Sequence, residues 1–102
     1  MALTKWTPTT NLHMLRRMGK LGEELAELSN VSNRIIIQGI DEVDQGSGKV
    51  NRFRLEQEIA DVLAQCACCI KELNLDKEYI DHRVADKISQ MAEWEGMFDV
   101  NE

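Results

Sequence analysis

The hydrophobic residues of this chain recur three and four positions apart in three long stretches, which predicts three amphipathic helices. The first helix is expected to begin after a cap at Asn11 or at the preceding threonines and to reach the late thirties. The second should run from about Arg52 to about Asn74, and Asp76 should cap the third. Between the first two, residues 39–51 break the pattern, and Asp, Gly and Ser cluster within residues 41–48, which is typical of a polar, mobile loop. The pattern predicts an all-α fold, an antiparallel bundle of three long helices with short additional pieces.

The length of 102 residues predicts a single domain, residues 1–102, that would gain stability by burying surface between subunits. A homodimer or homotetramer is therefore expected. The net charge of −6 argues against binding to a nucleic-acid polymer or a membrane surface, because both need a basic footprint. No apolar stretch approaches the roughly 20 residues that span a bilayer, and residues 1–6 lack the apolar core of a signal peptide. A cytoplasmic protein is expected, with Cys66, Cys68 and Cys69 as reduced core thiols.

Two eight-residue segments place acids within the apolar stripes of the first two helices. Residues 21–28 (LGEELAEL) and 55–62 (LEQEIADV) share the pattern Leu-x-(Glu/Gln)-Glu-(Leu/Ile)-Ala-acid-apolar. Residues three and four apart share a helical face, so Glu24 and Glu58 each interrupt an apolar stripe. Glu27 and Asp61 follow one turn later. Helices packed by these stripes would bring four carboxylates together, and such a group needs cations or protons to neutralise it.

Oxygen donors of this kind are the ligands that hard divalent cations prefer. The predicted metal ligands are Glu24, Glu27, Glu58 and Asp61, with Mg²⁺ as the expected cofactor and Mn²⁺ as its alternative. Neither segment contains the His of the Glu-x-x-His pairs that hold di-iron centres in helical bundles. A solvated acidic helix face is the competing interpretation, which the flanking apolar residues disfavour at Glu24 and Glu58.

The acids occur in a recognisable order, Glu-Glu-x-x-Glu followed by Glu-x-x-Asp, at Glu23, Glu24, Glu27, Glu58 and Asp61. This order resembles the signature of the MazG-like all-α nucleoside triphosphate pyrophosphohydrolases. Thr7-Pro8 and Asn11-Leu12 are similar to the start of the corresponding helix in the dCTPase branch of that superfamily. The resemblance covers about residues 6 to 95, although the 30 residues between the two acidic motifs exceed the usual gap. It implies an oligomeric MazG-like domain that hydrolyses an NTP or dNTP to the monophosphate and pyrophosphate, with Mg²⁺ bound by the four predicted ligands.

The candidate catalytic residues are Glu23 and Glu24. Glu24 would act as a metal ligand. Glu23 would orient the attacking water or hold a further ion, although helix geometry turns it about 100° from Glu24.

Candidate substrate contacts lie near the acids or carry positive charge. Arg34 lies two turns beyond Glu27, and Gln65 lies one turn beyond Asp61. The other candidates are Arg83 and Lys87 for phosphate and Trp6 for stacking on a base. An ordinary surface role for Arg34 and a packing role for Trp6 remain open. For the whole chain, the alternative function is a non-catalytic helical dimerisation or interaction module that retains the acidic bundle.

Overall fold

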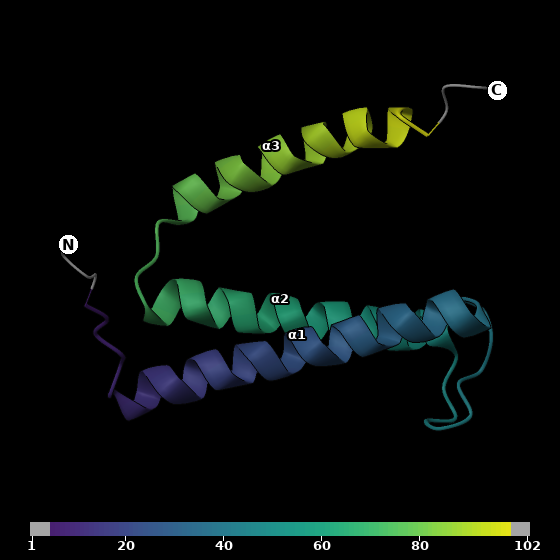
Figure 1. The fold of residues 1–102 in the computed structure, drawn as a ribbon, viewed down its shortest axis with the longest axis horizontal. Coiled ribbons are helices and arrows are strands. Elements are labelled where there is room, and N and C mark those ends of the chain that lie inside the picture. The colour runs from purple at the N-terminus through teal and green to yellow at the C-terminus, as the bar shows by residue number, and fades with distance from the viewer. Residues whose placement is uncertain (1–4, 99–102) are drawn as a thin grey trace. The chain divides into compact units, whose positions relative to one another are not determined.

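The computed structural model describes residues 5–98, which contain three α-helices: α1 (Leu12–Gln38), α2 (Asn51–Glu72) and α3 (Lys77–Gly96) (Figure 1). Within this range the only β-structure is an isolated bridge between Val43 and Val50. The all-α prediction and the number of long helices are therefore confirmed. Both ends of the predicted domain of residues 1–102, and most of the N-terminal segment judged to lack a signal peptide, lie outside the described residues.

Side-chain caps begin two of the helices. The Asn11 side chain accepts a hydrogen bond from the Met14 backbone N–H at 3.0 Å, and the Asp76 side chain accepts one from the Tyr79 backbone N–H at 2.9 Å. These bonds satisfy N–H groups of the first turn, which have no partner inside the helix. The predicted starts of α1 and α3 are confirmed, because both depended on this capping chemistry.

Residues with positive φ end the first two helices. Gly39, with φ of 104°, follows α1, and its N–H donates to the Ile35 carbonyl at 2.8 Å. Asn74, with φ of 52°, follows α2, and the next N–H, from Leu75, returns to the Ile70 carbonyl at 3.0 Å. Glycine and asparagine are the residues that most readily adopt such a conformation at a helix C-terminus.

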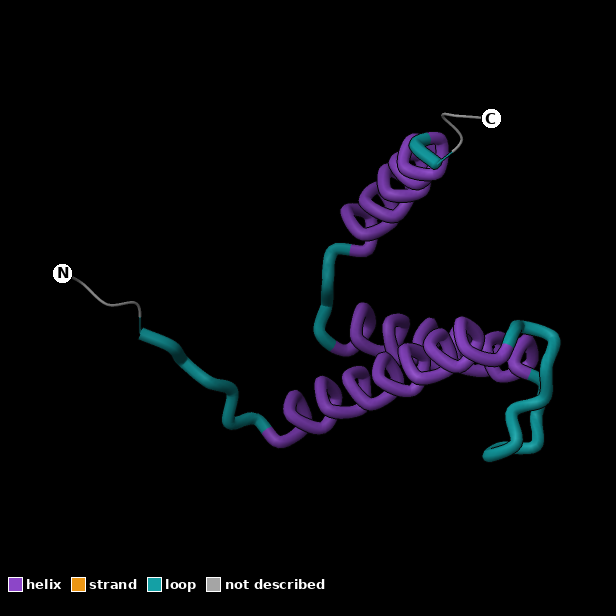
Figure 2. Tube along the Cα trace, turned by 45° about the vertical axis from the view of Figure 1, so that its right-hand side comes forward, coloured by secondary structure: helices purple, strands orange, loops and turns teal. Residues whose placement is uncertain are grey.

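The chain divides into two compact units, Met1–Cys69 and Ile70–Glu102. In the first unit α1 and α2 form an antiparallel helical hairpin (Figures 1 and 2). Arg17, near the start of α1, donates to Gln65 Oε1 of α2 at 3.1 Å. At the other end of the hairpin, Asn51 Nδ2 donates to Gln38 Oε1 at 2.9 Å. The antiparallel pairing predicted for the first two helices is thus present, and the second unit contains α3.

Hydrogen bonds to two buried polar side chains give the loop between α1 and α2 a defined conformation. Asn51, which is fully buried, donates to Gln38 Oε1 and, at 3.0 Å, to the Gly39 carbonyl. Asp44, only 7 % exposed, accepts from Gln38 Nε2 at 3.2 Å and from the Ser47 N–H at 2.9 Å. These contacts hold the pKa of Asp44 below its usual value, with the Gln38 hydrogen bond as the largest cause. The composition of this segment had indicated a mobile loop and gave no sign of this network.

Replacing Asn51 by Ala is expected to lower the free energy of unfolding by about 2 kcal/mol, because it empties a fully buried position and leaves half-buried acceptors of Gln38 and Gly39 without this donor. Urea denaturation measures the change. Asn33→Ala is the matched control, since Asn33 is exposed on α1, and it should shift the free energy by less than about 0.5 kcal/mol. Equal effects of the two substitutions would mean that the Asn51 hydrogen bonds do not stabilise the loop.

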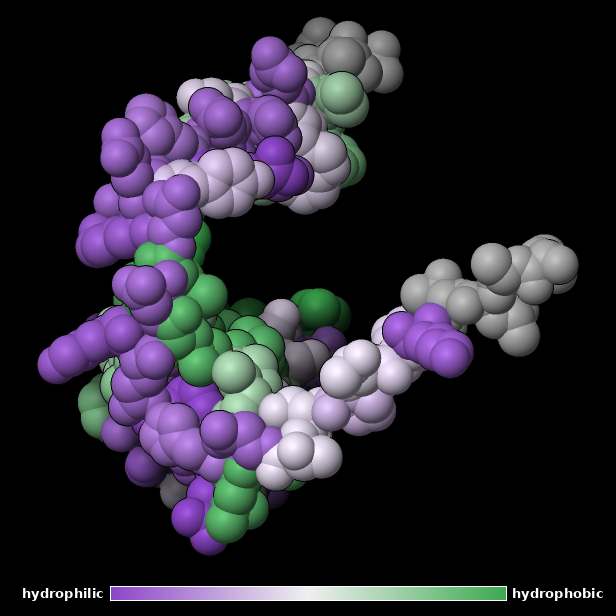
Figure 3. All heavy atoms as spheres, turned by 90° about the vertical axis from the view of Figure 1, so that its left-hand side faces the viewer, coloured by the Kyte–Doolittle hydropathy of each residue, from purple (hydrophilic) through white to green (hydrophobic). Residues whose placement is uncertain are grey.

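Hydrophobic side chains are mostly exposed. Among residues 5–98, the buried hydrophobic residues are Val31 and Cys69, and α3 buries none of its side chains. On the hairpin, Ile36 and Ile37 are 79 % and 74 % exposed. Figure 3, which faces the end of the hairpin where α1 begins, shows further hydrophobic surface in green. No helix of the described residues is long and apolar enough to cross a membrane. The apolar periodicity therefore identified the helices correctly but did not identify side chains that are buried.

Candidate metal centre

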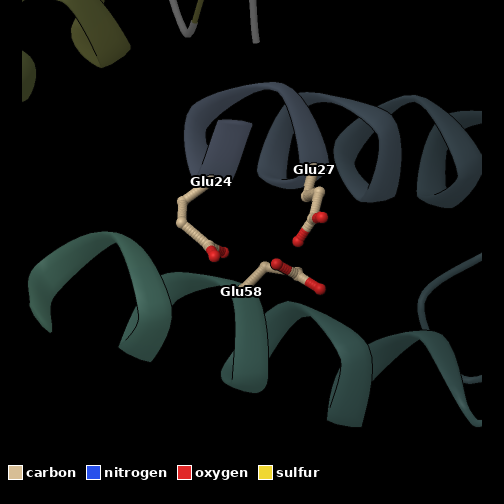
Figure 4. Close-up of side chains that lie close together, drawn as sticks. All are labelled: Glu24, Glu27 and Glu58. Atoms are coloured by element: carbon tan, nitrogen blue, oxygen red, sulfur yellow. The ribbon is translucent and has the colours of Figure 1, made fainter. Parts of the chain in front are cut away.

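Three carboxylates from the two helices of the hairpin converge on one point (Figure 4). Glu24 and Glu27, one turn apart on α1, point toward Glu58 on α2, and one oxygen from each lies within 4.8 Å of the others. Helical spacing explains the first pair. The antiparallel packing of α1 on α2 explains the third member, because the two acidic segments lie at the same level of the hairpin.

Two oxygens of this group are buried without a hydrogen-bond donor among the described residues. Glu24 is 7 % exposed, and its Oε1 lies 3.2 Å from Lys20 Nζ, whereas its Oε2 has no donor. Glu58 Oε2 is likewise buried and without a donor. A buried carboxylate oxygen that lacks a donor is costly, because folding removes its water and replaces it with nothing. Such oxygens are free to coordinate a cation.

The electrostatics of the group also favour a cation. The negative charge of Glu24 raises the pKa of Glu27, and desolvation and the charges of Glu58 and Glu23 add to the increase. A raised carboxyl pKa means that the surroundings oppose the charged form. A bound divalent ion would reverse that balance, since it would be the largest local charge in the site.

The donors present fit a hard divalent cation. All three are carboxylates, which supply the oxygen ligands that hard divalent cations such as Mg²⁺ and Mn²⁺ prefer. Oxygens that share one Mg²⁺ at about 2.1 Å lie at most about 4.2 Å apart. The group, with its atoms within 4.8 Å, is already close to that spacing. Small side-chain rotations would complete it.

Three further residues that the sequence predicted near the metal do not belong to this cluster of Glu24, Glu27 and Glu58. Asp61, the fourth predicted ligand, is exposed on α2 and lies outside the three-carboxylate group found among the described residues. Glu23 is also exposed, and its Oε2 lies 3.4 Å from Lys20 Nζ. Gln65 is half-buried and accepts the hydrogen bond from Arg17. The structure therefore brings together three of the four predicted ligands.

The other predicted substrate contacts are more dispersed. Arg34 is exposed and lines a hollow of about 790 Å³ near the loop. Trp6 precedes α1 and is 87 % exposed. Arg83 and Lys87 are exposed on α3, in the second unit.

Lys20 was not among the residues that the sequence indicated, yet it contacts two acids of the site. Its Nζ lies 3.2 Å from Glu24 Oε1 and 3.4 Å from Glu23 Oε2. The hydrogen bond to Glu24 is the largest cause of its raised pKa, followed by the charge of Glu23. A signal was present in the sequence, because Lys20 and Glu24 are four residues apart and an i,i+4 pair shares a helical face.

No family model, curated protein or solved structure matches this chain. Chemically, the arrangement provides three oxygen donors for a divalent ion, with a lysine beside them. A protein with a net charge of −6 repels polyanions as a whole. A cation held by these carboxylates would supply local positive charge for an anionic substrate.

Proposed function

We propose that this chain is a Mg²⁺-dependent nucleoside triphosphate pyrophosphohydrolase that converts an NTP or dNTP to the monophosphate and pyrophosphate. The observation that carries the proposal is the pair of buried oxygens Glu24 Oε2 and Glu58 Oε2. Neither has a hydrogen-bond donor among the described residues, and both side chains belong to the same cluster of three carboxylates. The order of the acids, which resembles that of the MazG-like enzymes, supports the same reaction.

The bound ion would neutralise charge on the phosphates and acidify a water molecule. Glu24, Glu27 and Glu58 would hold it through the oxygens that already face one another. Asp61 would add a fourth ligand, since its exposed side chain has no hydrogen bond or ion pair within the described residues and is free to turn.

Two further side chains would act on the reacting groups. Glu23 is exposed beside Glu24 and would accept a proton from the attacking water as a general base. Lys20, whose ammonium already contacts both acids, would stabilise charge on the pyrophosphate as it leaves.

The reaction is tested by incubating the purified protein with the four dNTPs and the four NTPs in Mg²⁺ and separating the products by ion-exchange chromatography. Equal amounts of monophosphate and pyrophosphate are expected from at least one nucleotide, and excess EDTA should stop their formation. Release of orthophosphate with a diphosphate would contradict the assigned bond cleavage. No product from any nucleotide would contradict the enzymatic proposal.

We also propose that the chain associates with itself, because a second copy would bury its exposed apolar side chains away from water. On α3 the exposed residues include Val84, Ile88 and Met91, which share one helical face. Sedimentation velocity should give a mass above the 11.7 kDa of one chain.

The exposed apolar residues of α3 equally support the rival function, a non-catalytic interaction module. An oligomer that neither hydrolyses nucleotides nor responds to Mg²⁺ would favour that rival.

A further inference from the structure

A hollow of about 790 Å³ lies in the first unit, and its lining begins about one helical turn from the three clustered carboxylates. It lies between the C-terminal half of α1, the loop and the first turn of α2, and its lining includes Asn30, Arg34, Gln38, Asp44, Ser47 and Arg54. Asn30 is three residues beyond Glu27, and Arg54 is four residues before Glu58. Each is therefore one helical turn from an acid of the group. The volume lies within the range of small-molecule sites, about 300–1,000 Å³.

The lining of this hollow is polar but carries no net charge. Its two arginines, Arg34 and Arg54, are balanced by Glu42 and Asp44. Arg54 is further neutralised directly, because its Nη1 lies 3.5 Å from Asp44 Oδ2. The other polar lining groups are amides and a hydroxyl. Such a surface suits an uncharged ligand that forms hydrogen bonds better than it suits a polyphosphate.

The opposite side of the carboxylate group is basic. Lys20 lies one turn before Glu24 on α1, and it lines a smaller hollow together with Arg16 and Arg17. Along α1 the order is thus a basic cluster, the acids of the candidate metal centre, and then the neutral hollow. A nucleoside triphosphate matches this order, because its charged phosphates would face the basic cluster and the candidate metal centre while its uncharged base would face the neutral hollow.

Two side chains in the hollow have polar groups available for a ligand. Asn30 and Arg34 are one turn apart on α1, and neither side chain forms a hydrogen bond or ion pair with any other residue that the structure describes. An asparagine amide offers a donor and an acceptor, which can match the edge of a base. An arginine guanidinium offers a planar set of donors and can also stack on an aromatic ring.

We propose that this hollow binds the nucleobase of the substrate through Asn30 and Arg34, with the triphosphate lying across the carboxylates toward Lys20. The inference rests on the proposed pyrophosphohydrolase function and adds the orientation of the substrate. It also makes the loop a determinant of base preference, because Glu42, Asp44 and Ser47 form one wall of the hollow.

The test compares kcat/KM for the four dNTPs in the full-length wild-type protein, Asn30→Ala and Arg34→Lys. Loss of a hydrogen-bonding pair to the base should lower kcat/KM for the preferred nucleotide about tenfold, mainly by raising KM. The ratio of kcat/KM between the preferred dNTP and the other dNTPs should also become smaller. Inorganic tripolyphosphate has no base, so its inhibition constant in Mg²⁺ should stay within twofold in both variants. Asn33→Ala is the control, because Asn33 is exposed on α1 and does not line the hollow.

Different outcomes separate the two proposals. If the wild-type protein hydrolyses nucleotides but both variants keep its kcat/KM values and base preference, the hollow is not the base site and the pyrophosphohydrolase function stands. A parallel loss of tripolyphosphate inhibition would assign Asn30 and Arg34 to phosphate and would also overturn the base assignment. If the wild-type protein hydrolyses no nucleotide, both proposals fail. Melting temperatures of the variants confirm that each remains folded.

Discussion

Replacing Glu24 by Gln is expected to lower Mg²⁺-dependent pyrophosphate release at least about a hundredfold. Glutamine keeps the size of the side chain but removes the negative charge and one of the two acceptor oxygens. Glu24 is the most buried acid of the group and has the buried Oε2 without a donor among the described residues. The substitution therefore removes the proposed ligand that is the most buried of the three.

The same substitution should remove the stabilisation by metal. For the wild-type protein, Mg²⁺ or Mn²⁺ at about 100 times its dissociation constant should add about 2.7 kcal/mol to the free energy of unfolding, which raises the melting temperature. Differential scanning fluorimetry with and without the ion measures this response in the absence of any nucleotide. In Glu24→Gln the rise should be lost or much reduced.

Glu56→Gln is the control for both measurements. Glu56 lies on α2, two residues before Glu58, but is exposed and outside the carboxylate group. Its activity and its metal response should stay within about twofold of the wild-type values. A full metal response in Glu24→Gln would exclude Glu24 as a ligand, and an equal loss in Glu56→Gln would point to a general effect of charge.

Local periodicity was enough to predict the helices and three members of the candidate site. The apolar spacing and the capping residues Asn11 and Asp76 depend on neighbours within about one turn, which a sequence displays directly. The meeting of Glu24 with Glu58 needed one further step, the antiparallel packing of two helices by their apolar stripes. That step was reliable because both acids interrupt the stripes at the same place.

Other features depend on information that spacing does not contain. Glu27 and Asp61 each follow a buried or half-buried Glu by three residues, yet only Glu27 joins the group found among the described residues. Asp61 is exposed and has a side chain one methylene shorter than that of Glu27, and identical spacing does not show which acid reaches the cluster. The loop network was also hidden, because the partners of Asn51 and Asp44 become neighbours only when the hairpin closes. Burial of two polar side chains cannot be predicted from the Asp- and Gly-rich composition of this segment.

Replacing Glu58 by Leu is expected to stabilise the metal-free protein while abolishing its activity. Leucine would continue the apolar stripe of α2, remove a buried oxygen that has no donor among the described residues, and relieve the repulsion with Glu27. The expected gain in the free energy of unfolding is about 1–2 kcal/mol at pH 7 in EDTA. Urea denaturation measures it, and Glu56→Leu, at an exposed position of the same helix, should change the value by less than about 0.5 kcal/mol.

The gain in the free energy of unfolding that Glu58→Leu gives the metal-free protein should depend on pH. The pKa of Glu27 is raised in the folded protein, with the charge of Glu24 as the largest cause and Glu58 as a contributor. Between the unfolded value, about 4.3, and the raised folded value, the folded state binds more protons, so its stability falls as pH rises. This loss of folding stability from the charged Glu27 is complete at pH values above the folded pKa and absent at pH values below the unfolded pKa. The gain in the free energy of unfolding of Glu58→Leu over the wild-type protein should therefore become smaller as the pH falls toward 4. At pH 7, saturating Mg²⁺ should make the wild-type protein the more stable of the two. A variant less stable than the wild-type protein in EDTA would show that the three acids do not repel one another, and the main physical argument for a bound cation would fail.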